Sequence, residues 1–189
     1  MQSTRAPVAS HASNTRSSES RHTVSRMSIA VISDTHMPRH GRRLPDACVE
    51  RIAAADLLLH AGDFSTLDVL RELEAIGPPV VGVHGNVDSA DLRRLLPEER
   101  VVEAEGASIA MVHDAGPRVG RLERMRRRFA DRADVVVFGH SHLPLHERAP
   151  DGFQIFNPGS PTERRRAAAH TMGRITVRDG LAQCDLIPL

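Results

Sequence analysis

Five short apolar runs each stop at a polar residue that can bind a metal ion, and this pattern constrains the fold more than any other feature. The runs are 29–32, 56–59, 80–83, 108–112 and 135–138, and the polar residues after them are Asp34 with His36, Asp63, Asn86, His113, and His140 with His142. Ligand sites of open α/β sheets lie outside the carboxyl ends of the strands. If the runs are strands, these seven side chains gather at one edge.

Segments with helical spacing separate several of these runs. Residues 46–54 follow a proline, and residues 65–77 repeat leucine at helical intervals, begin with Ser65 as a candidate cap, and end on a glycine. A short helix is expected near 89–96 and a strongly charged one over 120–133. Strands that alternate with helices predict an α/β layered domain.

Three hairpins are expected in the second half of the chain. Residues 100–104 and 108–112 flank a short Glu-Gly-Ala link, and the later turns fall at Asp151-Gly152 and Asp179-Gly180. Helix and strand alternation followed by hairpins indicates that the α/β domain is rich in sheet.

Length and composition narrow the class of protein. The 189 residues suffice for one well-buried domain, and 25 basic against 24 acidic residues leave a net charge of +1, which gives no strong nucleic-acid signal. Cys48 and Cys184 lie far apart, which suggests a reducing cytoplasm, and no apolar run approaches a membrane span. Residues 1–26 lack hydrophobic periodicity and are expected to form a disordered extension, or else a transit peptide, before a domain at 27–189.

The seven side chains form a mixed oxygen and imidazole set without thiolate. The set is too large for one four-coordinate ion and suits two ions that share a carboxylate. Carboxylate and imidazole ligands favour Mn, Fe, Zn, Co or Ni over Ca or Mg. Two such ions suit phosphoryl chemistry, because they acidify a bridging water and hold the attacking and leaving oxygens in line.

Six motifs in this order resemble those of the calcineurin-like metallophosphoesterases, and most closely the small prokaryotic YfcE-type phosphodiesterases. They are SDTH, HAGD, HGNVD, VHD, GHSH and NPGS, and the resemblance covers the chain from about Ile29 to its end. The family fold is an αββα sandwich, with two sheets flanked by helices. The resemblance therefore implies that fold for this chain.

Carried over residue by residue, the resemblance implies two ligand sets that share Asp63. The first ion would be bound by Asp34, His36, Asp63 and His142, and the second by Asp63, Asn86, His113 and His140. Asp63, Asn86 and His113 would act in catalysis, with Asn86 also reaching a phosphate oxygen of the substrate. Asn157 of the NPGS motif would support the site from outside the ligand set.

Two positions depart from the family pattern. Many relatives carry a histidine directly after the asparagine, where it helps protonate the leaving oxygen, but this chain has Val87. Family members also tend to read HGH where this chain has His113-Asp114-Ala115. Val87 predicts weak acid assistance and a preference for good leaving groups, and Asp114 is expected either to orient His113 or to lie near the substrate.

The implied activity is hydrolysis of a small-molecule phosphodiester by a hydroxide that bridges two divalent metal ions, with Mn2+ first among the candidates. A phosphomonoesterase or nucleotidase is the alternative, because the ligand set does not separate the two ester types. A non-catalytic scaffold of the same fold, similar to the retromer subunit of this family, is a third possibility. Small family members often form dimers or tetramers, so the resemblance allows a homo-oligomer.

Overall fold

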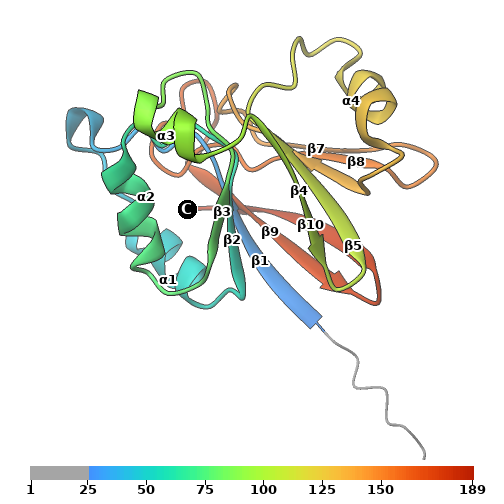
Figure 1. Cartoon of the computed structure of the whole chain (residues 1–189), viewed down its shortest axis with the longest axis horizontal. Helices are drawn as coiled ribbons and strands as arrows, with labels where there is room; N and C mark the ends of the chain where they lie inside the picture. Colours follow the sequence, from blue (N-terminus) through green and yellow to red (C-terminus); the bar gives the residue numbers. More distant parts are fainter. Residues whose placement is uncertain (1–25) are drawn as a thin grey trace, which may run out of the picture.

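Two packed five-stranded sheets with helices on their outer faces make up the protein (Figure 1), in a computed structural model that describes residues 26–189. The expected extension over residues 1–26 lies outside the described residues, apart from Arg26, with which the first strand begins. The αββα sandwich expected from the resemblance is confirmed.

The strand order places the five ligand-bearing strands in the two sheets. In spatial order, the first sheet holds β10 (Leu181–Pro188), β9 (Thr171–Arg178), β1 (Arg26–Ile32), β2 (Leu57–His60) and β3 (Val80–Gly82), and the second holds β4 (Glu99–Ala104), β5 (Ala107–Val112), β6 (Val135–Val137), β8 (Gln154–Asn157) and β7 (Leu145–Arg148). Strands β1, β2 and β3 are parallel, as are β5, β6 and β8. The carboxyl ends of β1, β2, β3, β5 and β6 carry the predicted ligands.

Both faces of the central strands are buried, which explains why their sequences are continuously apolar. Along β1, Ile29 and Val31 belong to the core between the sheets, whereas Ala30 and Ile32 belong to the core beneath the helices. On the outer face of the second sheet, a third core forms around Phe129.

The helices are α1 (Asp46–Ala53), α2 (Leu67–Glu74), α3 (Ala90–Leu95) and α4 (Arg121–Phe129), with a short 3-10 turn, η1 (Arg39–Gly41). The expectation that Ser65 caps α2 is wrong: the helix is preceded by Thr66, and no side chain caps it. Ser65 has φ of 100°, and its backbone N–H donates to Asp88 instead. Helix α4 ends at Phe129, four residues before the expected 133. There the Arg132 N–H donates to Phe129 O, three residues back, which closes a tighter turn than that of an α-helix. Within residues 26–189, no helix has both the length and the apolarity needed to cross a membrane.

The three expected hairpins are confirmed, as β4–β5, β7–β8 and β9–β10. The first turns at Glu105 and Gly106 (φ 44° and 84°) and the last at Asp179 and Gly180 (φ 51° and 75°). Two consecutive residues with positive φ are the requirement of the tight turn that matches strand twist, and Asp-Gly is a preferred sequence for it.

Candidate metal centre

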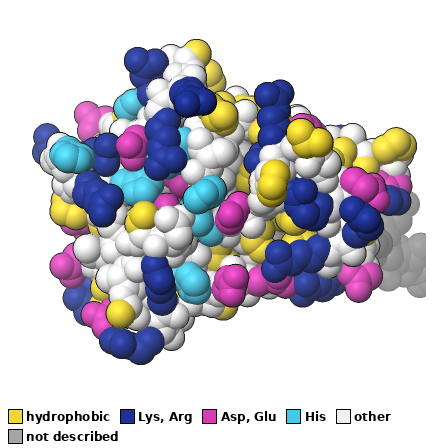
Figure 2. All heavy atoms as spheres, turned by 90° about the horizontal axis from the view of Figure 1, so that it is seen from above, with side chains coloured by type: hydrophobic (Ala, Val, Ile, Leu, Met, Phe, Trp, Pro, Cys, Tyr) yellow, Lys and Arg dark blue, Asp and Glu magenta, His cyan; other side chains and the backbone are white. Residues whose placement is uncertain are grey.

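The seven predicted ligands gather at the end of the sandwich where the parallel strands finish, the upper end in Figure 1. Figure 2 looks onto this end and shows histidine side chains in cyan grouped among acidic and basic ones. The loops after β1, β2 and β3 contribute from one sheet, and the loops after β5 and β6 contribute from the other. The site is therefore built across both sheets.

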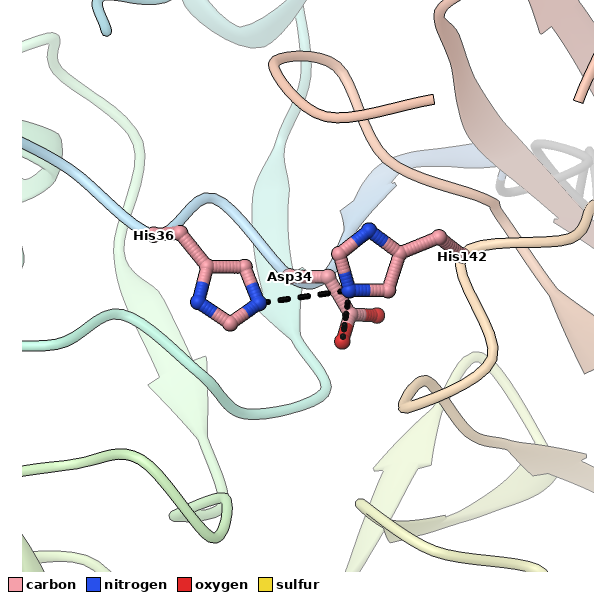
Figure 3. A group of neighbouring side chains, drawn as sticks. All are labelled: Asp34, His36 and His142. Atoms are coloured by element: carbon pink, nitrogen blue, oxygen red, sulfur yellow. Dashed lines mark hydrogen bonds and ion pairs between the residues drawn. The ribbon is translucent and has the colours of Figure 1, made fainter. Parts of the chain in front are cut away.

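A first group consists of Asp34, His36 and His142, which point toward one another (Figure 3). The Nε2 atoms of His36 and His142 lie 3.2 Å apart, and His142 Nε2 lies 3.3 Å from Asp34 Oδ1. All three residues are buried, and their ligand atoms lie within 4.8 Å of one another. The group could hold one metal ion.

A second group forms around Asp63, Asn86, His113 and His140. His113 Nε2 lies 3.3 Å from Asp63 Oδ2 and 3.1 Å from Asn86 Oδ1, and His140 Nδ1 lies 3.0 Å from the same Asn86 oxygen. Asp63 Oδ2 also lies 3.5 Å from His36 Nε2 of the first group. One oxygen of Asp63 thus lies between the two groups, as a shared ligand must.

Backbone carbonyls set the direction of two imidazoles. His113 Nδ1 donates to Ala61 O at 2.8 Å, and His142 Nδ1 donates to Glu163 O at 2.6 Å. Each bond leaves the Nε2 lone pair facing the other ligands, as metal-binding histidines require. The donor chemistry of the site fits transition-metal ions of the Mn to Zn series.

Five of the seven residues have left-handed backbone conformations, with φ between 46° and 67°: Asp34, His36, Asp63, His140 and His142. For a residue other than glycine, this region costs on the order of 1–2 kcal/mol. Such conformations persist only where neighbouring groups enforce them, and they concentrate at functional sites.

Asp88, for which no role was predicted from the sequence, holds the loops after β2 and β3 together. Its buried carboxylate accepts the backbone N–H groups of Asp63 (3.1 Å), Ser65 (2.7 Å) and Gly85 (2.7 Å). A Cβ on Gly85 would collide with Asp63, so the two loops approach closely only because position 85 has no side chain. Asp side chains in turns often accept hydrogen bonds from backbone N–H groups, so Asp88 at the end of HGNVD was a sequence signal for such a role. The sequence does not show which N–H groups it binds.

The turn after β8 supports the first group from outside. Ser160 Oγ donates to Asp34 O at 2.8 Å, and Thr162 Oγ1 donates to Thr35 O at 2.6 Å. Asn157, fully buried, donates from Nδ2 to Gly139 O at 2.8 Å, so it supports the loop that carries His140 and His142, as expected. Ser160 and Thr162 were missed, because hydroxyl groups on loops give no distinctive sequence signal.

Burial and pairing separate the pKa values of the site. Burial raises the pKa of Asp34 to about 7 and lowers the pKa of His142 to about 4. Burial opposes the ionised pair of Asp63 and His113, but their mutual hydrogen bond prevails, so the pKa of Asp63 is lowered to about 2 and that of His113 is raised to about 9. A metal ion binding through His113 Nε2 must therefore displace a proton at neutral pH.

The two departures from the family pattern have definite positions. Val87 contributes its backbone N–H, which donates to Asp63 Oδ1 at 3.0 Å. Asp114 does not orient His113, since Ala61 O has that role; its carboxylate accepts Gly116 N–H at 2.7 Å instead. Asp114 lines a groove of about 310 Å3 beside the second group. The other residues that line this groove are His84, Gly85, Asn86, Arg93, Glu98, Val112, His113, Arg128 and His140.

Two neighbours of the ligands are also placed. His60 is fully buried, accepts Gly62 N–H through Nδ1 at 3.2 Å, and stacks on Phe64, so it packs beneath the site. In the basic loop after β1, Arg42 pairs with Glu163 at 3.2 Å, and the other oxygen of Glu163 lies 3.9 Å from His36 Nε2. The ion pair of Arg42 and Glu163 thus lies beside the first group, with its acidic member toward His36.

Comparison with known proteins identifies the family. Residues 27–180 match the sequence model of the calcineurin-like phosphoesterase superfamily domain. The chain belongs to this family. It is 37% identical over 141 residues to a probable metallophosphoesterase of Methanothermobacter thermautotrophicus, an alignment that covers 74% of this chain and 80% of the relative.

Two further matches bear on activity and fold. A phosphodiesterase of Methanocaldococcus jannaschii is 26% identical over 146 residues, which cover 70% of this chain and 83% of that relative. The structure of vacuolar protein sorting 29 from Cryptosporidium parvum superposes with a TM-score of 0.70 at 22% identity and covers 87% of this chain and 98% of that one. The second match shows a shared fold.

Proposed function

We propose that this metallophosphoesterase is a phosphodiesterase that hydrolyses small phosphodiesters at a two-ion centre. The main support for this proposal is the position of Asp63 Oδ2, which lies 3.5 Å from His36 Nε2 and 3.3 Å from His113 Nε2. This oxygen therefore lies between two groups of metal-binding side chains, each of which offers enough donor atoms for one ion. A single structural ion would need only one of the groups.

The ligands are assigned to two ions that share Asp63. Asp34, His36, Asp63 and His142 hold the first, and Asp63, Asn86, His113 and His140 hold the second. When bound, two divalent transition-metal ions, with Mn2+ preferred among Mn, Fe, Zn, Ni and Co, would acidify the attacking water and neutralise charge on the phosphoryl oxygens. No side-chain nucleophile is needed.

The chain's own residues orient the substrate. The Oδ1 atom of Asn86 faces His113 and His140, which leaves its amide NH2 free to donate to a phosphate oxygen. The groove beside the second group receives one esterified group of the diester.

The preference for diesters rests on the Methanocaldococcus relative, which is named a phosphodiesterase. The preference among leaving groups rests on Val87, which supplies only a backbone N–H, so no side chain at that position can protonate a poor leaving group. We expect activity to favour diesters with acidic leaving alcohols, and we expect the protein to work in the cytoplasm, where its two buried, free cysteines stay reduced.

The test compares aryl phosphates under one metal. With Mn2+ present, the wild-type chain should hydrolyse bis(p-nitrophenyl) phosphate faster than p-nitrophenyl phosphate, and Asp63→Ala and His113→Ala should each abolish that hydrolysis. A faster monoester reaction would indicate a phosphomonoesterase or nucleotidase. Metal-loaded protein without turnover of either ester would indicate a non-catalytic scaffold, and activity retained in Asp63→Ala would contradict the assignment of the site.

A further inference from the structure

The two ligand groups differ in how firmly their surroundings fix them. Asp34, His36 and His142 are buried, whereas Asn86 and His140 of the second group are exposed. Packing therefore holds the first group in place, but packing alone cannot hold Asn86. In the loop after β3, Asp88 and Asp63 hold the backbone N–H groups on either side of Asn86, but neither bond is made to Asn86 itself.

Arg93 of α3 contacts Asn86 directly. Its Nε donates to Asp88 O at 3.0 Å, and its Nη2 donates to Asn86 O, so one guanidinium spans the backbone on both sides of Val87. A planar guanidinium can make both bonds at once, which an ammonium group cannot do with the same geometry. Arg93 also lines the groove beside the second group.

Helix α3 gives Arg93 a fixed base. Ser89 caps the helix by accepting Leu92 N–H, and Leu92 is fully buried in the core beneath the helices. The arginine next to this anchor reaches back over the loop that the helix follows. By contrast, Arg94 points to an exposed ion pair with Asp91 on the helix surface.

We infer that Arg93 is a positioning residue that fixes Asn86 and thereby sets the affinity of the second, more exposed ion site. The inference rests on the two-ion centre proposed above. Loss of a partner outside the ligand set typically weakens metal binding by about 10–100-fold. The first site, fixed by buried contacts, should not share that loss.

Calorimetric titration of the full-length, metal-free chain with Mn2+ tests the inference. Wild-type protein should show two binding steps. Arg93→Met should weaken the second step by about tenfold or more and leave the first unchanged. Arg93→Lys should show an intermediate loss, and the matched control Arg94→Met, on the same helix, should bind like wild type. Thermal unfolding of each metal-free variant shows whether it is folded, and Arg93→Lys carries the test if Arg93→Met is not.

The outcomes separate this inference from the proposed function. Equal weakening of both steps, or an Arg93→Met protein that binds like Arg94→Met, overturns the positioning role. A wild-type chain that binds two ions but hydrolyses no diester overturns the proposed activity while the role of Arg93 stands. Excess Mn2+ should restore the kcat of Arg93→Met toward that of wild type, because the defect lies in ion occupancy.

Discussion

Strain and burial of single residues distinguish this site from an ordinary loop cluster. Left-handed backbone at Asp34, Asp63 and His142 turns two carboxylates and one imidazole inward in the loops that follow β1, β2 and β6. Around them, buried His60 adds no ligand but fixes the backbone of Gly62. Residues of this kind tie the stability of the fold to the geometry of the site.

His60 makes stability depend on pH in a defined direction. Burial lowers the pKa of His60 from 6.5 to about 3 in the folded protein. Between pH 6.5 and pH 3, the imidazole is therefore protonated in the unfolded chain but neutral in the native one. Its contribution is fully present above pH 6.5 and is lost as pH falls toward 3. We expect the free energy of unfolding of the wild type to fall more steeply over this window than that of His60→Gln, by up to about 1.4 kcal/mol per pH unit.

Urea unfolding of the metal-free protein at several pH values measures this slope. Parallel pH profiles for the wild type and His60→Gln would show that the buried imidazole does not govern the acid limb.

Secondary elements were largely predictable, and the reason is local. The run 135–138 is apolar because both faces of β6 are buried. Asp179-Gly180 forms a turn because the turn requires positive φ at both positions, which Asp and Gly tolerate. The gathering of the seven side chains followed from strand ends and from the family resemblance. The supports from Asp88, Ser160 and Arg93 were not predictable, since they depend on contacts between loops that no local pattern encodes.

The hydroxyl groups of the turn after β8 contact the loop of Asp34 in the first group, whereas α3 contacts the loop of Asn86 in the second. Thr162→Val removes the hydroxyl that donates to Thr35 O but keeps the shape of the side chain. We expect it to weaken the first Mn2+ step by about tenfold and to leave the second unchanged, the reverse of Arg93→Met. Calorimetric titration of both variants measures the contrast, and a Thr162→Val protein that loses affinity at both steps would show that the turn supports the whole site rather than one group.

Across the whole molecule, the centre joins the two sheets. In each group, ligands from the loops after β1, β2 or β3 face a histidine from the loop after β5 or β6: Asp34 faces His142, and Asp63 faces His113. An ion bound in either group would therefore fasten one sheet to the other at the end that Figure 2 shows. Elsewhere the sheets are held by the apolar core between them, which is not directional, and by hydrogen bonds such as those from Gln154 Nε2 to Ala182 O and from Gly180 N–H to Glu105 O.

Metal binding should therefore stabilise the entire fold rather than one loop. A ligand that binds only the native state adds about 2.7 kcal/mol at a free concentration of 100 times its Kd, and two ions at this saturation add about twice as much. We expect Mn2+ to raise the midpoint of thermal unfolding in one cooperative transition, and a chelator to remove the whole gain along with diester hydrolysis. His113→Ala, which leaves the ligands Asp34, His36 and His142 in place, should retain roughly half of the gain. Ca2+ should give much less, because the site is rich in imidazole. If Mn2+ left the unfolding midpoint unchanged while restoring activity, the ions would bind a site that does not join the sheets.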